Sequence, residues 1–276
     1  MKKGKTSGEG AAHGAGQPAV GRLAVCMLAS GSRGNAIYVS DGTTAVLFDA
    51  GLSGIEIQRR MASRGLSPEK LDAIVVSHEH NDHVNAVGVL ARRFDLPVYI
   101  NAGTLRAADR LGALPRTVAF ACGTAFGIKT LNIRPFSTSH DAADPVGFTV
   151  ERSGRKLAIA TDLGIVTAMV REHLRGAHIL VLEANHDPDM LINGPYSWPL
   201  KQRIRSRLGH LSNQDTRELL KSVAHPGLQH VILAHLSETN NTPHRARSEV
   251  GLALDDVRVR LTVSSQDRSS KLIFTR

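Results

Sequence analysis

The feature of this sequence that most constrains its fold is a run of ligand-type side chains at residues 77–83, Ser-His-Glu-His-Asn-Asp-His. It contains the pattern His-x-His-x-Asp-His, and it directly follows an apolar run at residues 74–76 that is typical of a buried strand. A helical pattern at residues 84–94 begins right after it. The cluster is therefore predicted to lie on a short loop at the carboxyl end of a strand, where the ligand-binding loops of α/β proteins converge.

The residue types of this cluster are those that bind divalent cations. Neutral imidazole and carboxylate groups are good zinc ligands, and three histidines with one aspartate exceed what a single tetrahedral catalytic ion takes from one loop. In a tight loop His78 and His80 can point to one side while Asp82 and His83 point elsewhere, which suits two neighbouring ions better than one. A polar surface loop formed by accident is the alternative, but four such side chains rarely follow a buried strand by chance.

Several other predicted strands also end in a side chain that can bind a metal. The residues that end or directly follow these strands are Asp49, His78, His140, Asp162, Glu183 and His235. Together they predict one site at one edge of a two-sheet sandwich, because the ends of neighbouring strands converge at such an edge. Strand patterns mixed with flanking helices in both halves of the chain predict an α/β fold with four layers, αββα.

Two further segments are interpreted from their turn and cap residues. Residues 30–35, Ser-Gly-Ser-Arg-Gly-Asn, form a turn whose backbone N–H groups and hydroxyls could hold a phosphate, which makes Ser30 and Ser32 candidate substrate contacts. A plain hairpin turn explains this pattern equally well. Helices are predicted over residues 53–64 and 214–224, with Ser53 and Asn213 as candidate N-caps.

The charge balance of the chain favours a polyanionic partner. Thirty-four Lys and Arg residues against 25 acidic ones give a formal net charge of +9, and nucleic acid is the first partner that such a balance suggests. A generally basic proteome or a solvated face explains the same charge, so charge alone does not decide. Two hundred and seventy-six residues suffice for one large α/β domain. We expect that domain at residues 21–276, preceded by a disordered tail at residues 1–20.

Composition also bears on the compartment. Two cysteines, Cys26 and Cys122, do not make a disulfide scaffold. The chain has no apolar stretch long enough to span a bilayer, and its first 18 residues carry Lys and Gly without the apolar segment of a secretory signal. We therefore expect a soluble cytoplasmic protein with no membrane partner. Nothing in the sequence predicts an oligomeric state.

In combination, several short motifs resemble those of the metallo-β-lactamase superfamily. Besides the histidine cluster they are Phe-Asp-Ala-Gly at residues 48–51, the loop at residues 28–35, Leu-Glu-Ala-Asn-His-Asp at residues 182–187, Gly-His-Leu-Ser-Asn at residues 209–213 and Ala-His-Leu-Ser at residues 234–237. The resemblance spans nearly the whole chain. It is strongest to the WalJ type, a group of small bacterial members regarded as DNA exonucleases, and it implies the four-layer metallo-β-lactamase sandwich.

This resemblance implies a centre with two divalent cations, zinc or manganese, with iron also possible. The ligands that it implies are His78, His80 and His140 for the first cation, Asp82, His83 and His235 for the second, and Asp162 as the bridge. Asp49 would orient a ligand histidine. A hydroxide shared by the two cations would be the nucleophile, and the cations would clamp the attacking and leaving oxygens of a phosphodiester.

The resemblance also implies an acid that protonates the departing oxygen. Glu183 and His210 are similar to a Glu and His pair in the branch of the superfamily that processes transfer RNA, so Glu183 would orient His210 as general acid. Asp82, Glu183 and His210 are thus the candidate catalytic residues. Asn185 and His186 are further candidate substrate contacts. Trp198 either stacks on a nucleobase or holds its loop in place.

The predicted function is that of a dinuclear-metal phosphodiesterase, a DNA exonuclease that the resemblance makes 5'-to-3'. The alternative is a thioester or lactone hydrolase of the glyoxalase-II type, which would use the cations but would not need His210. Diiron redox relatives usually carry Glu where this chain has His80, which disfavours iron redox chemistry. A metal-stabilised binding protein is disfavoured because open metal positions beside an acid exceed what stability requires.

Overall fold

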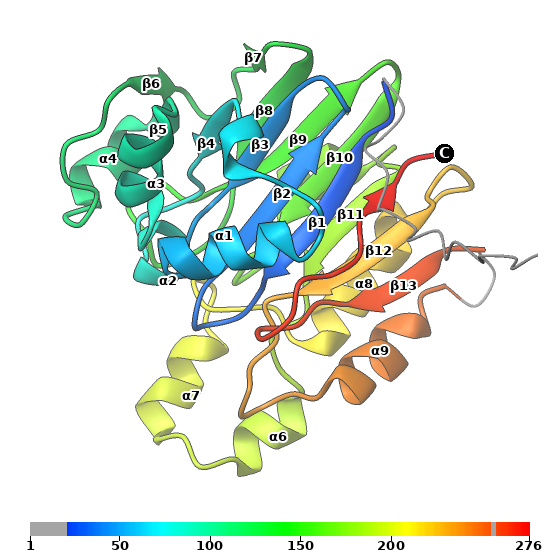
Figure 1. Ribbon diagram of the computed structural model, residues 1–276. Helices are drawn as coiled ribbons and strands as arrows, with labels where there is room; N and C mark the ends of the chain where they lie inside the picture. Colours follow the sequence, from blue (N-terminus) through cyan, green and yellow to red (C-terminus); the bar gives the residue numbers. More distant parts are fainter. Residues whose placement is uncertain (1–20, 255–257) are drawn as a thin grey trace, which may run out of the picture.

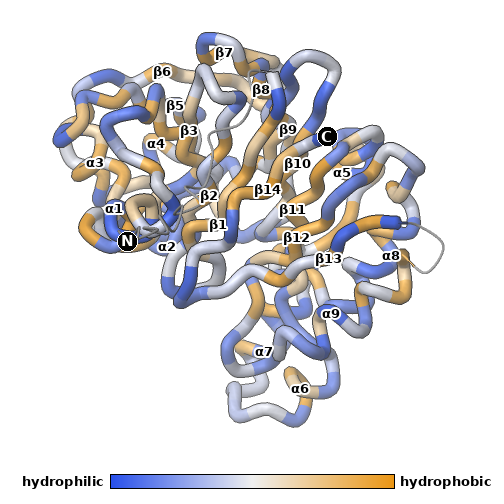
Figure 2. Tube along the Cα trace, turned by 45° about the vertical axis from the view of Figure 1, so that its right-hand side comes forward, coloured by the Kyte–Doolittle hydropathy of each residue, from blue (hydrophilic) through white to orange (hydrophobic). Residues whose placement is uncertain are grey.

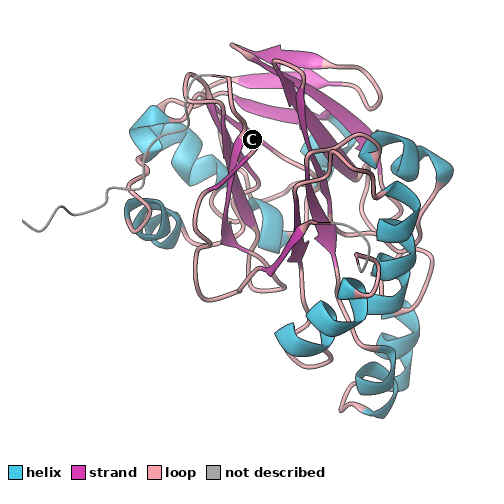
Figure 3. Cartoon of the chain, turned by 90° about the vertical axis from the view of Figure 1, so that its right-hand side faces the viewer, coloured by secondary structure: helices cyan, strands magenta, loops and turns pink. Residues whose placement is uncertain are grey.

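The structure is a computed structural model that describes residues 21–254 and 258–276. The tail predicted at residues 1–20 lies outside the described residues. Within the described ranges the chain forms two facing sheets of seven strands each, with helices on the outer face of both (Figures 1 and 3). These four layers confirm the predicted αββα arrangement. The described residues contain no helix long and apolar enough to cross a membrane.

The first sheet is built from the amino half of the chain and its last strand. Its strand order is β14-β1-β2-β3-β4-β5-β6, and β3 to β6 run parallel. The two antiparallel neighbours of β1 are β2 and β14, so the end of the chain closes this sheet. The strands are β1 Ala24–Ala29, β2 Ala36–Ser40, β3 Ala45–Phe48, β4 Ala73–Val75, β5 Val98–Asn101, β6 Thr117–Phe120 and β14 Ile273–Phe274.

The second sheet is built from the carboxyl half, in the order β13-β12-β11-β10-β9-β8-β7. Its strands β10 to β13 are parallel, and β7 to β10 form an antiparallel meander. The strands are β7 Phe126–Ile128, β8 Leu131–Ser137, β9 Val146–Arg152, β10 Arg155–Ala160, β11 Ile179–Glu183, β12 His230–Ala234 and β13 Arg260–Val263. The carboxyl ends of its parallel strands all lie at one edge.

Alternation of side chains along the strands produces three apolar layers. In β1, Val25 and Met27 pack between the two sheets, whereas Cys26 and Leu28 pack on the other face, against the outer helices. Successive side chains of a strand point to opposite faces, so a continuous apolar strand fills two layers at once. The third layer lies between the second sheet and its helices. Figure 2 shows the hydrophobic stretches concentrated along the strands.

Helices cover both sheets, and two more helices extend beyond them. The first sheet carries α1 Gly54–Ala62, α2 Asn81–Val84, α3 Val87–Phe94 and α4 Ala102–Ala107, with a 3-10 turn at Pro68–Lys70. The second sheet carries α5 Ala168–Leu174, α8 Asn213–Val223 and α9 Pro243–Gly251. The remaining helices, α6 Pro188–Asn193 and α7 Trp198–Ile204, lie past the ends of the strands (Figures 1 and 3).

The helix starts agree with the prediction at one cap and correct it at another. The Ser53 side chain accepts a hydrogen bond from the backbone of Glu56, which makes Ser53 the N-cap of α1 as predicted. The predicted N-cap Asn213 is wrong. Ser212 caps α8 instead, because its hydroxyl accepts from the backbone N–H of Asp215 while the Asp215 carboxylate accepts from the backbone of Ser212. This reciprocal pair is a capping box, which satisfies two otherwise unpaired N–H groups.

Candidate metal centre

Five elements deliver ligand-type side chains to one edge of the sandwich. His78 follows β4, His140 follows β8, Asp162 follows β10, and His235 follows β12. Asp82 and His83 lie in α2 rather than in the predicted loop, because Asn81–Val84 forms a short helix. His78 and His80 remain in the segment before this helix, and the ring of His83 packs against that of His78, with 4.0 Å between the ring centroids.

The structure brings all seven residues of the expected ligand set together, in two groups. The possible ligand atoms within each group lie within 4.8 Å of one another. Asp162 also forms such a group with His78 and His83, so it lies between the other two. The first group is His78, His80 and His140, and the second is Asp82, His83 and His235.

Each histidine of the first group donates a hydrogen bond to the protein from one ring nitrogen. The other ring nitrogen faces the other histidines of the group. His80 Nε2 lies 3.2 Å from the backbone oxygen of Asp141, and His140 Nδ1 lies 3.2 Å from that of Gly209. A carbonyl can only accept, so these nitrogens carry the protons. In the neutral rings the other nitrogens, His80 Nδ1 and His140 Nε2, therefore carry lone pairs, and these two atoms lie 3.3 Å apart. Two converging lone pairs repel each other unless a proton or a metal cation lies between them.

His78 completes this group through a chain of hydrogen bonds. The Ser77 hydroxyl donates to Asp49 Oδ2 at 2.7 Å, so it accepts from His78 Nδ1 at 2.9 Å. His78 Nε2 is left without a hydrogen-bond partner, as is Asp162 Oδ2, and both atoms are buried. Buried polar atoms in native proteins are almost always satisfied, by an ion where no other partner exists. These nitrogen and oxygen donors therefore fit a divalent cation, and the residues that carry them form a candidate metal-binding site.

Asp49 is hydrogen-bonded to residues that position both groups. Its carboxylate accepts the backbone N–H of Ser77 at 2.8 Å and lies 2.8 Å from His83 Nδ1. This contact places the proton of His83 on Nδ1 and leaves Nε2 facing Asp82 Oδ2 and Asp162 Oδ2, each at 3.5 Å. The expected role of Asp49, to orient a ligand histidine, agrees with this geometry.

The electrostatics of the second group depend on its carboxylates. Burial alone would lower the pKa of His83, but Asp162 and Asp82 raise it well above its ordinary value. Burial would also lower the pKa of His235, but Asp162 raises it well above its ordinary value. The pKa of Asp162 is lowered in turn, despite burial, by His235 and His83. Protons thus balance the carboxylates where no cation does, and a bound cation would displace them.

Glu183 orients two histidines at once. Its Oε1 accepts from His210 Nδ1 at 2.7 Å and from His235 Nδ1 at 3.0 Å, while Oε2 accepts the backbone N–H groups of Leu163 and Leu211. Although burial raises its pKa, His210 and these hydrogen bonds lower the pKa of Glu183 to about 2. Four donors occupy the carboxylate, so Glu183 holds the rings of His210 and His235 in place.

A cavity of about 280 Å³ opens onto this centre. The candidate ligands His80, Asp82, His140, Asp162 and His235 line it. His210 also lines it, with 21% of its side chain exposed. Because Glu183 holds His210 at Nδ1, the free Nε2 is the nitrogen available to a substrate in the cavity. The segment between Glu183 and His210 also lines the cavity, through Tyr196, Leu200, Arg203 and Ile204.

Three of the central residues have a left-handed backbone. Asp49, Asp162 and His235 have φ values of 58°, 60° and 54°. Residues other than glycine rarely adopt this conformation, and where they do so at a site the surrounding structure holds them there. Each follows directly on a parallel strand, or nearly so. The left-handed turn is what redirects the side chain from the strand into the centre.

The four expected substrate contacts do not share one environment. Ser32 and Asn185 line the cavity. Ser30 is buried, and its hydroxyl accepts the backbone N–H of His235 at 2.7 Å, so it positions a candidate ligand from behind. His186 is also buried, its Nδ1 has no hydrogen-bond partner, and burial lowers its pKa to about 4.

Sequence reasoning missed Asn35, which lies at the centre. Its Nδ2 is 3.1 Å from Asp82 Oδ2 and 3.0 Å from His83 Nε2, and its backbone N–H donates to the Asp82 carbonyl at 2.7 Å. It thereby fastens the loop at residues 30–35 to α2. The sequence did contain a signal for this role. An asparagine in the Gly-Asn turn at residues 34–35 has a side chain that can donate hydrogen bonds.

Gly51 permits the close approach of α2 to the segment after β3. A Cβ atom at this position would lie 1.6 Å from the carbonyl oxygen of Asp82. We expect Gly51→Ala to displace α2, to destabilise the fold by about 3 kcal/mol or more, and to reduce bound metal. Chemical denaturation and metal analysis would measure both effects. Gly127→Ala is the control, because its nearest neighbour would lie 4.0 Å away. Equal stability of the two variants would contradict this prediction.

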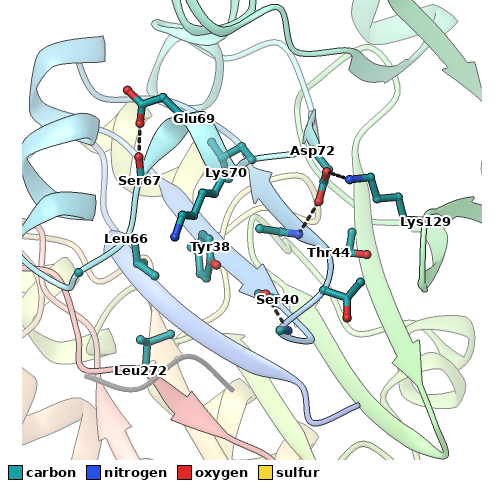
Figure 4. A pocket seen from close by; sticks show the side chains of 15 residues that line it. Tyr38, Ser40, Thr44, Leu66, Ser67, Glu69, Lys70, Asp72, Lys129 and Leu272 are labelled. Atoms are coloured by element: carbon teal, nitrogen blue, oxygen red, sulfur yellow. Dashed lines mark hydrogen bonds and ion pairs between the residues drawn. The ribbon is translucent and has the colours of Figure 1, made fainter. Parts of the chain in front are cut away.

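A second cavity, of about 410 Å³, lies at the opposite end of the first sheet (Figure 4). It is lined by residues at the start of β3 and just before β4, among them Ala45 and Asp72, and Lys70 extends into it. It contains no histidine and none of the expected site residues. The chemistry of the histidine cluster is thus confined to the carboxyl ends of the strands.

Comparison with known proteins agrees with this fold. A family model described as a β-lactamase superfamily domain matches residues 44–236. An exodeoxyribonuclease YycJ from Bacillus anthracis is 39% identical over 83% of this chain and 88% of its own length. An exodeoxyribonuclease WalJ from Streptococcus pneumoniae (strain D39) is 37% identical over 78% of this chain and 82% of its own.

A solved structure shares the fold. The metallo-β-lactamase fold protein YhfI from Bacillus subtilis superimposes with a TM-score of 0.71, at 16% identity, over 90% of this chain and 99% of its own. The chain therefore belongs to the metallo-β-lactamase superfamily, in the family of the YycJ and WalJ proteins. The predicted resemblance is confirmed.

Proposed function

We propose that this protein is a divalent-metal-dependent DNA exonuclease that hydrolyses phosphodiester bonds from the 5' end. The observation that carries the proposal is the position of His210, which Glu183 holds at 2.7 Å in the same cavity as the candidate metal ligands. A phosphodiester needs a proton on its departing oxygen, and an imidazole beside the reacting phosphate can supply it. The relatives named exodeoxyribonuclease support DNA as the substrate.

The proposed cofactors are two divalent cations. His78, His80 and His140 would hold one, Asp82, His83 and His235 the other, and Asp162 would contact both. Imidazole and carboxylate donors suit zinc and manganese, and iron is also compatible with them. Bound there, two such ions would polarise the phosphate and activate a water molecule for attack.

The residues of the chain would divide the remaining work. Glu183 keeps the proton of His210 on Nδ1, so that the other nitrogen of the protonated ring can donate to the departing oxygen. Asp49 and Glu183 fix the rings of His83 and His235, one in each half of the fold. Ser32 and Asn185, which line the cavity, are the proposed phosphate contacts. The proposed location of the enzyme is the cytoplasm.

The alternative is a thioester or lactone hydrolase on the same scaffold. A thiolate leaves without a proton, so a thioester hydrolase would gain little from a histidine held as an acid. In this chain Glu183 is buried and fully hydrogen-bonded beside His210. An arrangement that elaborate around one histidine favours the phosphodiesterase over the thioesterase.

The proposal predicts stepwise shortening of linear DNA from its 5' end. Purified protein supplied with manganese or zinc is expected to release labelled mononucleotides first from 5'-end-labelled duplex DNA. Chelation of the metal should abolish this activity. A thioester such as a glutathione ester serves as the competing substrate in parallel. Thioester cleavage with intact DNA would overturn the proposal in favour of the alternative, and release of label only after complete digestion would reverse the polarity.

A further inference from the structure

The segment between Glu183 and His210 forms an arm over the metal centre. We call residues 188–208, which contain α6 and α7, the α6–α7 arm. It extends beyond the ends of both sheets (Figures 1 and 3). Of the nine large hydrophobic side chains exposed in the described residues, four belong to this arm: Ile192, Trp198, Leu200 and Leu208. An arm that exposes so much apolar surface beside a catalytic cavity is a candidate for substrate contact.

One face of this arm forms a wall of the cavity. Tyr196, just before α7, lines the cavity together with Leu200, Arg203 and Ile204 of that helix. Positions 200, 203 and 204 are spaced by three and four residues, so they share one face of α7. The same cavity is also lined by His80, His140 and His210. A molecule bound in this cavity would therefore lie between the histidines and this face of the arm or beside both.

Arg203 ties this face to the first metal group. Its Nε donates to Asp141 Oδ2 at 2.7 Å, and Nη2 donates to the same oxygen. The other oxygen of Asp141 lies 3.4 Å from His140 Nε2. The Arg203 side chain is still 66% exposed, and a guanidinium has donors beyond the two used here. Arg203 can thus present a positive charge to the cavity while it holds the arm in place.

The arm itself is internally braced. The ammonium group of Lys201 is largely buried and donates to the backbone oxygen of Ile192 at 2.7 Å, which fixes α7 against α6. Gly209 ends the arm, and a Cβ atom there would lie 2.1 Å from the carbonyl oxygen of Ile204. The wall that Tyr196 and Leu200 provide is therefore a preformed surface rather than a loose loop.

We propose that Tyr196, Leu200 and Arg203 form the subsite for one unpaired nucleotide next to the scissile phosphate. This inference rests on the proposed function and specifies its substrate class as a DNA end with unpaired bases. A phenol ring and a leucine offer a flat apolar surface for a base, and a guanidinium offers donors for a phosphate. A cavity of about 280 Å³ suits one nucleotide unit and not a base pair.

Trp198 is not part of this subsite, although the sequence singles it out. It is 57% exposed and does not line the cavity. It precedes Leu200 by two positions, which places it about 160° away around the axis of α7. Trp198 is therefore a matched control: it is aromatic, exposed and on the same helix, but it faces away from the centre.

The test compares Tyr196→Ala, Tyr196→Phe and Trp198→Ala in the metal-loaded full chain. On a single-stranded oligothymidylate, Tyr196→Ala is expected to raise KM roughly 5- to 150-fold, the range for loss of stacking on one base. Tyr196→Phe should retain the original KM, and Trp198→Ala should change it less than about twofold. Metal content, measured on the same preparations, should be unchanged in all three variants and so report an intact centre.

Binding measurements separate this proposal from the proposed function. Fluorescence anisotropy with the same oligothymidylate, and with one whose terminal nucleotide is abasic, gives a readout independent of cleavage. Wild-type protein should prefer the intact end, and Tyr196→Ala should lose that preference. If the protein cut DNA while Tyr196→Ala bound and cut like wild type, the subsite would be wrong and the exonuclease right. If the preference for the intact end were present without cleavage, the subsite would stand and the exonuclease would fall.

Discussion

Replacement of His210 by alanine is expected to lower kcat on DNA by roughly 10²- to 10⁴-fold, the usual contribution of a positioned general acid. The loss of kcat should arise in the step in which the leaving oxygen departs, because the sugar alkoxide is a poor leaving group without a proton. Metal content should not change, since Glu183 still holds His235 in this variant. Steady-state kinetics on end-labelled DNA and metal analysis of the same preparation would measure the two quantities.

The leaving group provides a sharp control for this expectation. A p-nitrophenolate leaves without protonation, so the variant should retain most of its activity on bis(p-nitrophenyl) phosphate. His244→Ala, an exposed histidine of α9, should behave like wild type on both substrates. Equal losses on both substrates would mean that His210 acts on the centre as a whole and not as an acid. Glu183→Gln, in contrast, should reduce activity and metal content together, because it releases His235 as well as His210.

The second large effect is a release of protons on metal binding. His83 and His235 have pKa values well above the ordinary value of 6.5 in the cation-free protein, so both are protonated at neutral pH. Each must lose its proton to become a ligand. We expect the first metal titration of stripped protein at neutral pH to release about two protons. Calorimetric titrations in buffers of different ionisation enthalpy would count them, and release of none would refute the assignment.

Two comparisons test the cause of this proton release. Asp49→Asn removes one of the carboxylates that raise the pKa of His83 while Asp162 and Asp82 remain, so this variant should release fewer protons than wild type. Stability gives the second comparison. Protonated His83 and His235 stabilise the cation-free fold below pH 6.5, and this contribution is lost as pH rises through their raised pKa values. The Tm of stripped protein should therefore fall on the alkaline side, while that of the metal-loaded protein should not.

The general shape of the centre could be predicted from the sequence, because each ligand-type residue follows a strong strand pattern. Parallel strands end at a common edge whatever their order in the sheet. His140, Asp162 and His235 come together for this reason although nearly a hundred residues separate the first from the last. The four-layer fold could be predicted in the same way, because near-continuous apolar strands must be buried on both faces.

The predictions that were wrong or incomplete concern where helices begin, which depends on competition between neighbouring residues for the same cap position or turn. Ser212 and Asn213 are both good N-caps, and Asp215 decided between them by completing the capping box with Ser212. The α6–α7 arm was missed because Gly194, Pro195 and Pro199 suggest a loop. Yet Pro188 and Pro199 each lie in a first helical turn, where proline costs no hydrogen bond.

The roles of Tyr196 and Ser30 lay beyond any sequence pattern. Which of two aromatic residues faces a cavity depends on where α7 begins, and a shift of two positions turns a side chain to the opposite side of a helix. Ser30 was expected at the substrate because it is a hydroxyl in a glycine-rich turn. Its contact with the His235 backbone arises between segments 205 residues apart in the chain.

The left-handed backbone at Asp49, Asp162 and His235 divides the centre into positions that protein engineering can and cannot change freely. After glycine, asparagine, aspartate and histidine adopt such a conformation most readily, so exchange of His235 for cysteine would strain the main chain as well as alter the donor. His80 and Asp82 carry no such constraint, since one has an extended backbone and the other lies in α2. A library that aims to retune this centre for another cation should vary those two positions and keep the three turns unchanged.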